Sequence, residues 1–147
     1  MISDPTCPFC DIVHRFDPDA REVYRDEYTV AFFPEEPATL GHTLVIPSQH
    51  IRDIWSLDLE TAARLARTVT ALAGAVRRTV VPDGLNIIQS NGEAATQTVM
   101  HLHTHIVPRW TNDPIGRIWP PETHYAETEK DAVWAALRTE CRHIDGP

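Results

Sequence analysis

The chain has 147 residues, of which 42% are hydrophobic and 23% are charged, a profile typical of one folded globular domain. Thirteen Lys and Arg residues against 21 Asp and Glu residues give a formal net charge of −8, whereas binding to a nucleic-acid backbone needs a basic surface. No apolar run approaches the roughly 20 residues that cross a bilayer, and the first residues lack the basic start and apolar stretch of a secretory signal. We therefore expect a cytoplasmic domain that has neither nucleic acid nor a membrane as its partner.

The first half of the chain predicts short strands. Residues 23–33 mix β-branched and aromatic residues with charges, which indicates a hairpin or two short strands that end at the proline-containing segment 34–37. Residues 43–46 form an apolar run between Gly41 and Pro47, which predicts a short buried strand.

A long helix is predicted next. Asp58 is a candidate N-cap, and the Pro82-Asp83-Gly84 sequence must end the helix. Between them, apolar residues recur with helical spacing, at Leu59, Ala62, Ala66, Val69, Leu72, Ala73, Val76 and Val80.

The second half predicts two further strands, at residues 85–89 and 99–107, separated by a loop of small residues. Residues 110–124 are rich in proline and predict a structured loop, and residues 127–143 predict a C-terminal helix. Because parallel strands would need helices between most of them, this order of elements favours an antiparallel α+β domain.

Three cysteines offer a first candidate site. Cys7 and Cys10 form a Cys-Pro-Phe-Cys sequence, and Cys141 lies alone near the other end. In a reducing compartment, such a pair indicates metal or redox chemistry more often than a structural disulfide. A thioredoxin-type redox pair follows a strand, whereas this pair lies near the start of the sequence, which favours a metal.

Three alternating histidines form a second candidate site. His101, His103 and His105 are three of the eight histidines in the chain, and on a strand their side chains share one face. Chance exposure or a neutral hydrogen-bonded ladder is an alternative. The pattern otherwise indicates metal ligation or imidazole chemistry on a substrate.

The sequence His-Leu-His-Thr-His-Ile-Val at residues 101–107 resembles the signature of the histidine-triad (HIT) family of nucleotide hydrolases and transferases. Other family motifs recur in the same order: Cys7-Pro-Phe-Cys-Asp-Ile12, Gly41-His-Thr-Leu-Val-Ile-Pro47 with His50, Asp83-Gly-Leu-Asn86, and Asn91-Gly-Glu-Ala-Ala95 followed by Gln97-Thr98. The resemblance implies an α+β, HIT-like fold with an antiparallel sheet of about five strands, one long helix and a C-terminal helix. It implies a single domain over residues 1–147, with its core at about 7–109 and a C-terminal loop and helix at 110–147, and it implies a homodimer.

The resemblance also assigns chemistry to the three histidines. His103 would be the nucleophile that attacks the α-phosphorus of a purine nucleotide or dinucleotide, such as a dinucleoside polyphosphate or a nucleoside phosphoramidate. The backbone carbonyl of His101 would accept the Nδ1 proton of His103, and His105 would orient the site and stabilise charge on the phosphate. A neutral imidazole suits this role because it offers an unprotonated nitrogen near pH 7.

Further positions match substrate-binding residues of similar proteins. Phe9, Ile12 and Phe32 match an apolar base pocket, although plain core packing is an equal interpretation. Gln97 and Thr98 match residues that hydrogen-bond phosphate oxygens and the leaving group, and Ser90 stands where a longer amide side chain is usual. His42 matches a recurring family histidine, which would either support the other histidines or cap a strand.

A structural zinc ion is the expected cofactor. In some HIT proteins two cysteines, a histidine after the Ile-Pro strand and the first triad histidine bind zinc, and the matching residues here are Cys7, Cys10, His50 and His101. Such a Cys2His2 set gives tetrahedral coordination with no open position. The alternative is a reduced, metal-free thiol pair beside histidines that serve other purposes.

Some positions depart from the family pattern and leave the substrate open. Pro34 stands where an Asp or Asn commonly accepts the ribose hydroxyls, and Thr96 stands where glycine is common. These departures favour an alternative, a nucleotide-binding or sensing module with negligible turnover. A dinucleoside polyphosphate phosphorylase is a further alternative, because phosphate can replace water as the acceptor.

Overall fold

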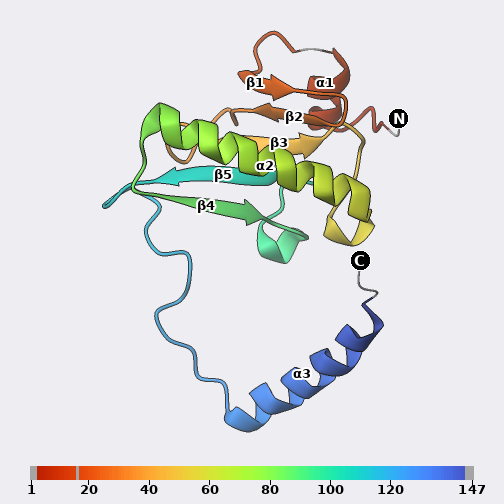
Figure 1. The fold of residues 1–147 in the computed structure, drawn as a ribbon, viewed down its shortest axis with the longest axis vertical. Coiled ribbons are helices and arrows are strands. Elements are labelled where there is room, and N and C mark those ends of the chain that lie inside the picture. The colour runs from red at the N-terminus through yellow and green to blue at the C-terminus, as the bar shows by residue number, and fades with distance from the viewer. Residues whose placement is uncertain (1–2, 16, 145–147) are drawn as a thin grey trace. The chain divides into compact units, whose positions relative to one another are not determined.

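The computed structural model describes residues 3–15 and 17–144. The chain divides into two compact units, Met1–Ile115 and Gly116–Pro147. The first unit holds one antiparallel sheet of five strands in the order β1-β2-β3-β5-β4 (Figure 1). The strands are β1 (Glu22–Arg25), β2 (Thr29–Phe32), β3 (Thr43–Pro47), β4 (Gly84–Gln89) and β5 (Thr104–Arg109). The helices of this unit are α1 (Pro8–Arg15) and α2 (Leu59–Val80), with short 3-10 turns η1 (Ile54–Ser56) and η2 (Glu93–Ala95). The predicted α+β class is therefore confirmed.

The long helix α2 has the predicted ends. The Asp58 carboxylate accepts a hydrogen bond from the Thr61 backbone N–H, as an N-cap does, and Val81 ends the helix with φ 48°. The predicted apolar stripe is only partly right. Leu59 is 88% exposed, whereas Leu65, which the stripe omitted, is buried. Side chains are buried only on the turns of the helix that contact the sheet, and Leu59, at the first position of the helix, lies outside those turns.

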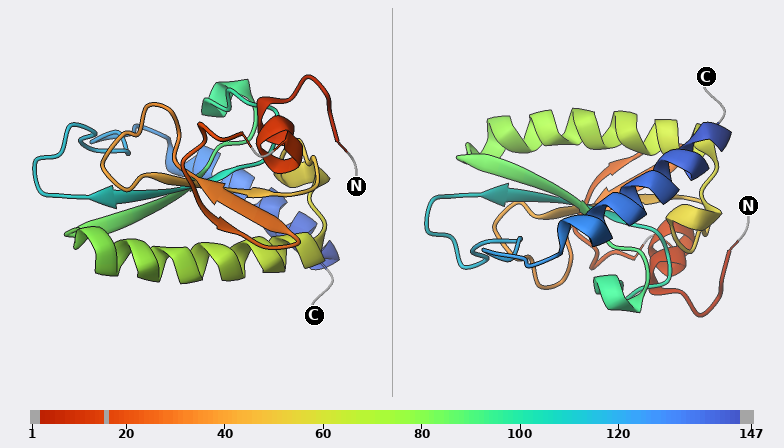
Figure 2. Two further views of the ribbon diagram at one scale, coloured as in Figure 1. Left: turned by 90° about the horizontal axis from the view of Figure 1, so that it is seen from above. Right: turned by 90° about the horizontal axis from the view of Figure 1, so that it is seen from below.

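The two faces of the sheet carry two apolar clusters, because side chains alternate along each strand. On one face, Leu65 of α2 packs with a cluster of Ala31, Val45, Ile51, Leu102 and Ile106. On the other face, α1 contributes Phe9, Cys10 and Val13 to a cluster that also contains Cys7, Val30, Phe32, Leu44 and Ile46. Figure 2 shows α1 and the η2 turn on the side of the sheet opposite α2.

The strand predicted at residues 99–107 is wrong at its start. β5 begins at Thr104 and pairs with β3 through Val45–Thr104, Leu44–His105 and Thr43–Ile106. Before Thr104 the chain leaves the sheet, and the Leu102 N–H donates to the carbonyl of Ile51 instead, at 2.6 Å. His101 and His103 therefore precede the strand, and only His105 lies on it.

Helix α1 was not predicted from the sequence. Its eight residues bury Phe9, Cys10 and Val13 against the sheet. At its C-terminal end, the Arg25 guanidinium donates to the carbonyls of Val13 and Ile12, at 2.9 and 3.0 Å. This contact joins α1 to β1 and fixes the position of the cysteine pair.

The second unit contains the predicted C-terminal helix, which is α3 (Glu127–Glu140) followed by the short turn η3 (Cys141–His143). The Glu129 carboxylate accepts a hydrogen bond from the Ala126 N–H at the start of α3. Val133, Trp134 and Leu137 are exposed on this helix. Within the described part of the chain, none of the helices is both long enough and apolar enough to span a membrane.

A core substitution tests the packing of α2 on the sheet. Ile106 is fully buried in the cluster beneath α2, so Ile106→Ala should lower the free energy of unfolding by about 2–5 kcal/mol, through lost burial and the cavity that remains. Chemical denaturation measures this change. The matched control is Leu40→Ala, because Leu40 is 78% exposed and its loss should cost less than about 0.5 kcal/mol. Equal effects of the two substitutions would contradict this packing.

Candidate functional site

Four metal-ligand side chains from distant parts of the sequence meet at one end of the sheet. Cys7 precedes α1, Cys10 lies within it, His50 follows β3 and His101 precedes β5. One ligand atom from each residue lies within 4.8 Å of the others. Cys7 Sγ lies 3.5 Å from His101 Nδ1, and Cys10 Sγ lies 3.4 Å from His50 Nδ1 and 3.7 Å from His101 Nδ1. The structure thus brings together the four predicted ligands.

The chemistry of this cluster suits a tetrahedral metal. His101 Nε2 donates to the carbonyl of Pro47 at 2.9 Å, which leaves the lone pair of Nδ1 directed at the sulfur atoms. A backbone carbonyl that holds the outer nitrogen of a ligating imidazole is a common arrangement in metal sites. Burial lowers the pKa of His101 to about 4 and raises the pKa of Cys7. Two sulfur and two nitrogen donors fit zinc well.

His103 is held next to this cluster by the backbone. Its Nδ1 donates to the carbonyl of His101 at 2.7 Å, so the lone pair of a neutral ring lies on Nε2. His103 is 4% exposed, and burial lowers its pKa below the usual value for histidine. None of the described residues forms a hydrogen bond with its Nε2. His103 therefore carries a free, unprotonated nitrogen at neutral pH.

His105 lies beside His103 and contacts a fourth histidine. The ring centroids of His103 and His105 are 5.0 Å apart. His105 Nδ1 lies 2.8 Å from His42 Nε2, and His42 Nδ1 accepts a hydrogen bond from the Ala38 N–H at 3.0 Å. Burial, together with the nearby His103 and His42, lowers the pKa of His105 to about 4. The sequence left the role of His42 open, and the structure places its ring against His105.

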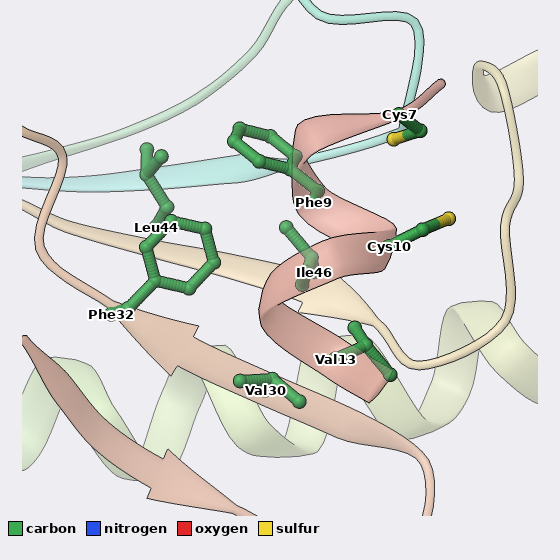
Figure 3. Packing of buried hydrophobic residues seen from close by; sticks show 8 residues of the cluster. All are labelled: Cys7, Phe9, Cys10, Val13, Val30, Phe32, Leu44 and Ile46. Carbon is green, nitrogen blue, oxygen red and sulfur yellow. The ribbon is translucent and has the colours of Figure 1, made fainter. Parts of the chain in front are cut away.

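The predicted apolar residues lie between the histidines and the core. Phe9 contacts Phe32 edge to face at 5.3 Å and also meets the ring of His103 at 5.3 Å. Figure 3 shows Phe9 directed towards Phe32 and Leu44, while Cys7 and Cys10 lie at the other end of the cluster. Ile12 is half-buried and packs against the same cluster. These residues are core residues, and through Phe9 they also form a wall of the histidine site.

The polar residues predicted to bind phosphate have unequal surroundings. Gln97 is 3% exposed, and its amide nitrogen donates to the carbonyls of Arg52 and Val99, while its Oε1 accepts from the Gly92 N–H. Both amide protons are thus used within the chain, and Gln97 fixes the shape of the loop before His101. The Thr98 side chain is exposed, and Ser90 is half-buried.

Two parts of the site could not be found by motif alone. The Ala38 N–H is a backbone group, so no residue type signals its contact with His42. The sulfur–imidazole contacts depend on α1, a helix that the motifs do not predict. The signal that could have predicted α1 is the apolar spacing Phe9, Ile12 and Val13, which buries one face of a helix.

Comparisons with known proteins agree with this geometry. Residues 15–112 match the family model described as HIT domain. A relative named Protein hit, from Bacillus subtilis, is 41% identical over 119 residues, which cover 80% of each chain. The crystal structure of a zinc-bound histidine-triad family protein from Mycobacterium smegmatis has a TM-score of 0.70 and 36% identity, and covers 92% of this chain and 97% of the other.

One relative carries an enzyme name. Adenylylsulfatase HINT3 of Arabidopsis thaliana is 28% identical over 129 residues, which cover 86% of this chain and 64% of the relative. The family thus includes hydrolases. The HIT domain match covers residues 15–112, the Bacillus subtilis relative is 41% identical, and His101, His103 and His105 lie close together. We conclude that this chain belongs to the HIT domain family.

Proposed function

We propose that this protein is a HIT-type nucleoside phosphate hydrolase or nucleotidyl transferase that cleaves its substrate at the α-phosphate. The substrates are dinucleoside polyphosphates or nucleoside phosphoramidates. The observation that carries the proposal is the state of His103, whose Nδ1 proton is held by the His101 carbonyl at 2.7 Å. Its Nε2 lone pair, kept unprotonated by burial, is the group that attacks phosphorus.

The reaction has two balanced steps. In the first, Nε2 of His103 forms a bond to the α-phosphorus, and the bond from phosphorus to the leaving group breaks with its electron pair. The leaving group takes up a proton, and a nucleotidyl-histidine remains. In the second, water attacks phosphorus and loses a proton, the P–N bond breaks, and a nucleoside monophosphate leaves His103 neutral again.

The other histidines support this chemistry in different ways. His101 positions His103 through its carbonyl, and His105 faces the same region with its ring 5.0 Å from that of His103. In this proposal His105 stabilises charge on the phosphate. The purine packs against the wall formed by Phe9, Ile12 and Phe32. The hydroxyls of Ser90 and Thr98 and the backbone of the loop held by Gln97 receive the phosphate oxygens.

The proposal includes a structural zinc ion held by Cys7, Cys10, His50 and His101. The four donor atoms within 4.8 Å of one another support it, as does the zinc-bound relative from Mycobacterium smegmatis. When bound, zinc supplies a cross-link between α1, the loop after β3 and the segment before β5. The homodimer implied by the family resemblance and the cytoplasmic location expected from the sequence belong to the same proposal.

A nucleotide-binding module with negligible turnover is the second candidate. One observation favours it: Pro34 offers no side-chain acceptor at the position where the family pattern has a ribose-binding carboxylate or amide. Phosphorolysis is a variant of the first candidate in which inorganic phosphate, rather than water, attacks the nucleotidyl-histidine.

Product analysis tests the enzyme. With diadenosine tetraphosphate or adenosine phosphoramidate, the purified protein should release AMP, and His103→Ala should lower the rate by about 10³-fold or more because the nucleophile is gone. Chromatography of the products measures both, with and without inorganic phosphate. ADP that carries added phosphate would identify the phosphorylase variant.

The matched control is His124→Ala, since the side chain of His124 is 85% exposed and its loss should leave the rate unchanged. Nucleotide binding with no product from the unaltered protein would contradict the enzyme and support the binding module. Equal rates for His103→Ala and the unaltered protein would exclude the nucleotidyl-His103 intermediate.

Elemental analysis tests the zinc site. The purified protein should contain one zinc per chain, and Cys10→Ser should remove most of it, because Cys10 Sγ contacts both His50 and His101. Removal of zinc by a chelator should lower the unfolding temperature, since metal binding adds to folding stability. Cys141→Ser is the control, because Cys141 is exposed and outside the cluster. A zinc content that is unchanged in Cys10→Ser would overturn this ligand set.

A further inference from the structure

Cys7 and Cys10 stand at the start of α1 with a backbone spacing that suits a disulfide. The Cys7 carbonyl accepts a hydrogen bond from the Asp11 N–H at 3.2 Å, so Cys7 caps the helix and Cys10 lies in its first turn. Cα atoms three residues apart in a helix are separated by about 5 Å, and a disulfide joins Cα atoms that are about 4.4–6.8 Å apart. The backbone therefore already has the separation that a bond between the two sulfur atoms requires.

The two sulfur atoms also face the same point. Cys7 Sγ lies 3.5 Å and Cys10 Sγ lies 3.7 Å from one atom, His101 Nδ1, and the two sulfur atoms lie within 4.8 Å of each other. Both cysteines are free thiols in this structure, and Figure 3 shows them together at the end of the cluster away from Phe32. A rotation of the two side chains, without a large movement of the backbone, would bring the sulfur atoms together.

We propose that Cys7 and Cys10 are a reversible oxidation site, at which hydrogen peroxide or an organic hydroperoxide converts the two thiols to a disulfide and thereby releases the zinc ion. Metal binding and redox chemistry are compatible in one pair, because thiolates bind zinc and a disulfide does not. Disulfides in reducing compartments are mostly transient and redox-sensing. The release of zinc rests on the zinc site proposed above, whereas the disulfide stands on the cysteine geometry alone.

Exposure decides which sulfur atom reacts first. Cys7 is 6% exposed and directly follows the exposed residues Pro5 and Thr6. Cys10 is 2% exposed, and its sulfur accepts a hydrogen bond from the Asp4 N–H at 3.4 Å. An oxidant that arrives from solvent therefore meets Cys7 first, and Cys10 is the thiol that resolves the product.

The oxidation has two balanced steps. The Cys7 thiolate attacks one oxygen of the peroxide, the O–O bond breaks, hydroxide leaves, and the sulfur becomes a sulfenic acid. The Cys10 thiolate then attacks this sulfur, the S–O bond breaks, and a second hydroxide leaves. Each hydroxide takes up a proton and becomes water. The two thiolates supply both electrons that reduce the peroxide, and no electron comes from zinc, which has no redox chemistry.

The disulfide would affect the rest of the site through His101. The oxidised sulfur atoms carry no negative charge for a cation, so His50 and His101 alone remain, which is too few ligands for a closed tetrahedral site. The carbonyl of His101 holds His103 at 2.7 Å, so the loss of the metal bond at His101 Nδ1 would loosen the proposed nucleophile. This consequence for catalysis rests on the proposed function.

Mass spectrometry and zinc detection test the site together. The Cys141→Ser protein is used, because the exposed Cys141 thiol would otherwise react as well. After one equivalent of hydrogen peroxide, the intact mass should fall by the mass of two hydrogen atoms, and peptide mapping should place the disulfide between Cys7 and Cys10. A chelating dye should detect free zinc in proportion to the disulfide. Turnover should fall in the same proportion, and dithiothreitol with added zinc should restore it.

Two serine variants in the same background separate the roles of the sulfur atoms. Cys10→Ser lacks the resolving thiol, so peroxide should leave a sulfenic acid on Cys7 that dimedone traps. Cys7→Ser is the matched variant, and it should form much less of this adduct, because the Cys10 thiol is the less accessible of the two. If either variant does not fold, timed alkylation of the Cys141→Ser protein gives the order, and Cys7 should be modified before Cys10.

The proposal is overturned if Cys7 and Cys10 both remain free thiols after peroxide treatment, which is the behaviour of an inert structural pair. It is also overturned if the disulfide forms while zinc stays bound. A protein that forms the disulfide but holds no zinc before oxidation would refute the zinc site and support the oxidation site. If the protein has no turnover at the outset, the proposed function fails, while the mass and zinc measurements still decide the oxidation.

Discussion

The candidate site depends on His101 more than on any other residue, because this residue makes three contacts with different parts of the chain. Its Nε2 donates to the carbonyl at the end of β3, its Nδ1 faces the two cysteine sulfur atoms, and its own carbonyl accepts the proton of His103. Its side chain is completely buried. A shift of His101 would therefore disturb the metal-ligand cluster and the orientation of His103 together, which couples the proposed zinc ion to the proposed nucleophile.

The sequence predicted the elements whose signals are local. The N-cap Asp58, the stop at Pro82–Gly84 and the apolar run at 43–46 each act within a few residues, and the structure has α2 and β3 there. The start of β5 could not be predicted this way. Residues 99–103 alternate like a strand. In the folded chain, however, His101 contacts Cys7 and Cys10, which lie more than 90 residues away in sequence, and these long-range contacts override the local pattern.

The residue types of the site could likewise be read from the sequence, whereas their roles depend on contacts that form only when the chain folds. The alternation of His101, His103 and His105 was visible in the sequence, whereas the work of Gln97 depends on where the carbonyls of Arg52 and Val99 lie after folding. A glutamine whose amide protons both bind backbone carbonyls shapes its loop, so that in the proposed reaction the phosphate would be bound by hydroxyls and backbone N–H groups instead. The residue type is the one that the motif led us to expect, but its atoms are used differently in this conformation.

The histidines of the site gain their different properties from backbone groups. The carbonyls of Pro47 and His101 can only accept and the Ala38 N–H can only donate, so each fixes the proton of the ring that it contacts. Side-chain partners could change their protonation with pH, but these backbone groups cannot. Because burial also keeps the rings neutral, the arrangement of lone pairs and protons persists across the neutral range. For the proposed reaction, a chain with a net charge of −8 would therefore meet an anionic substrate with N–H donors fixed by the backbone rather than with a cationic surface.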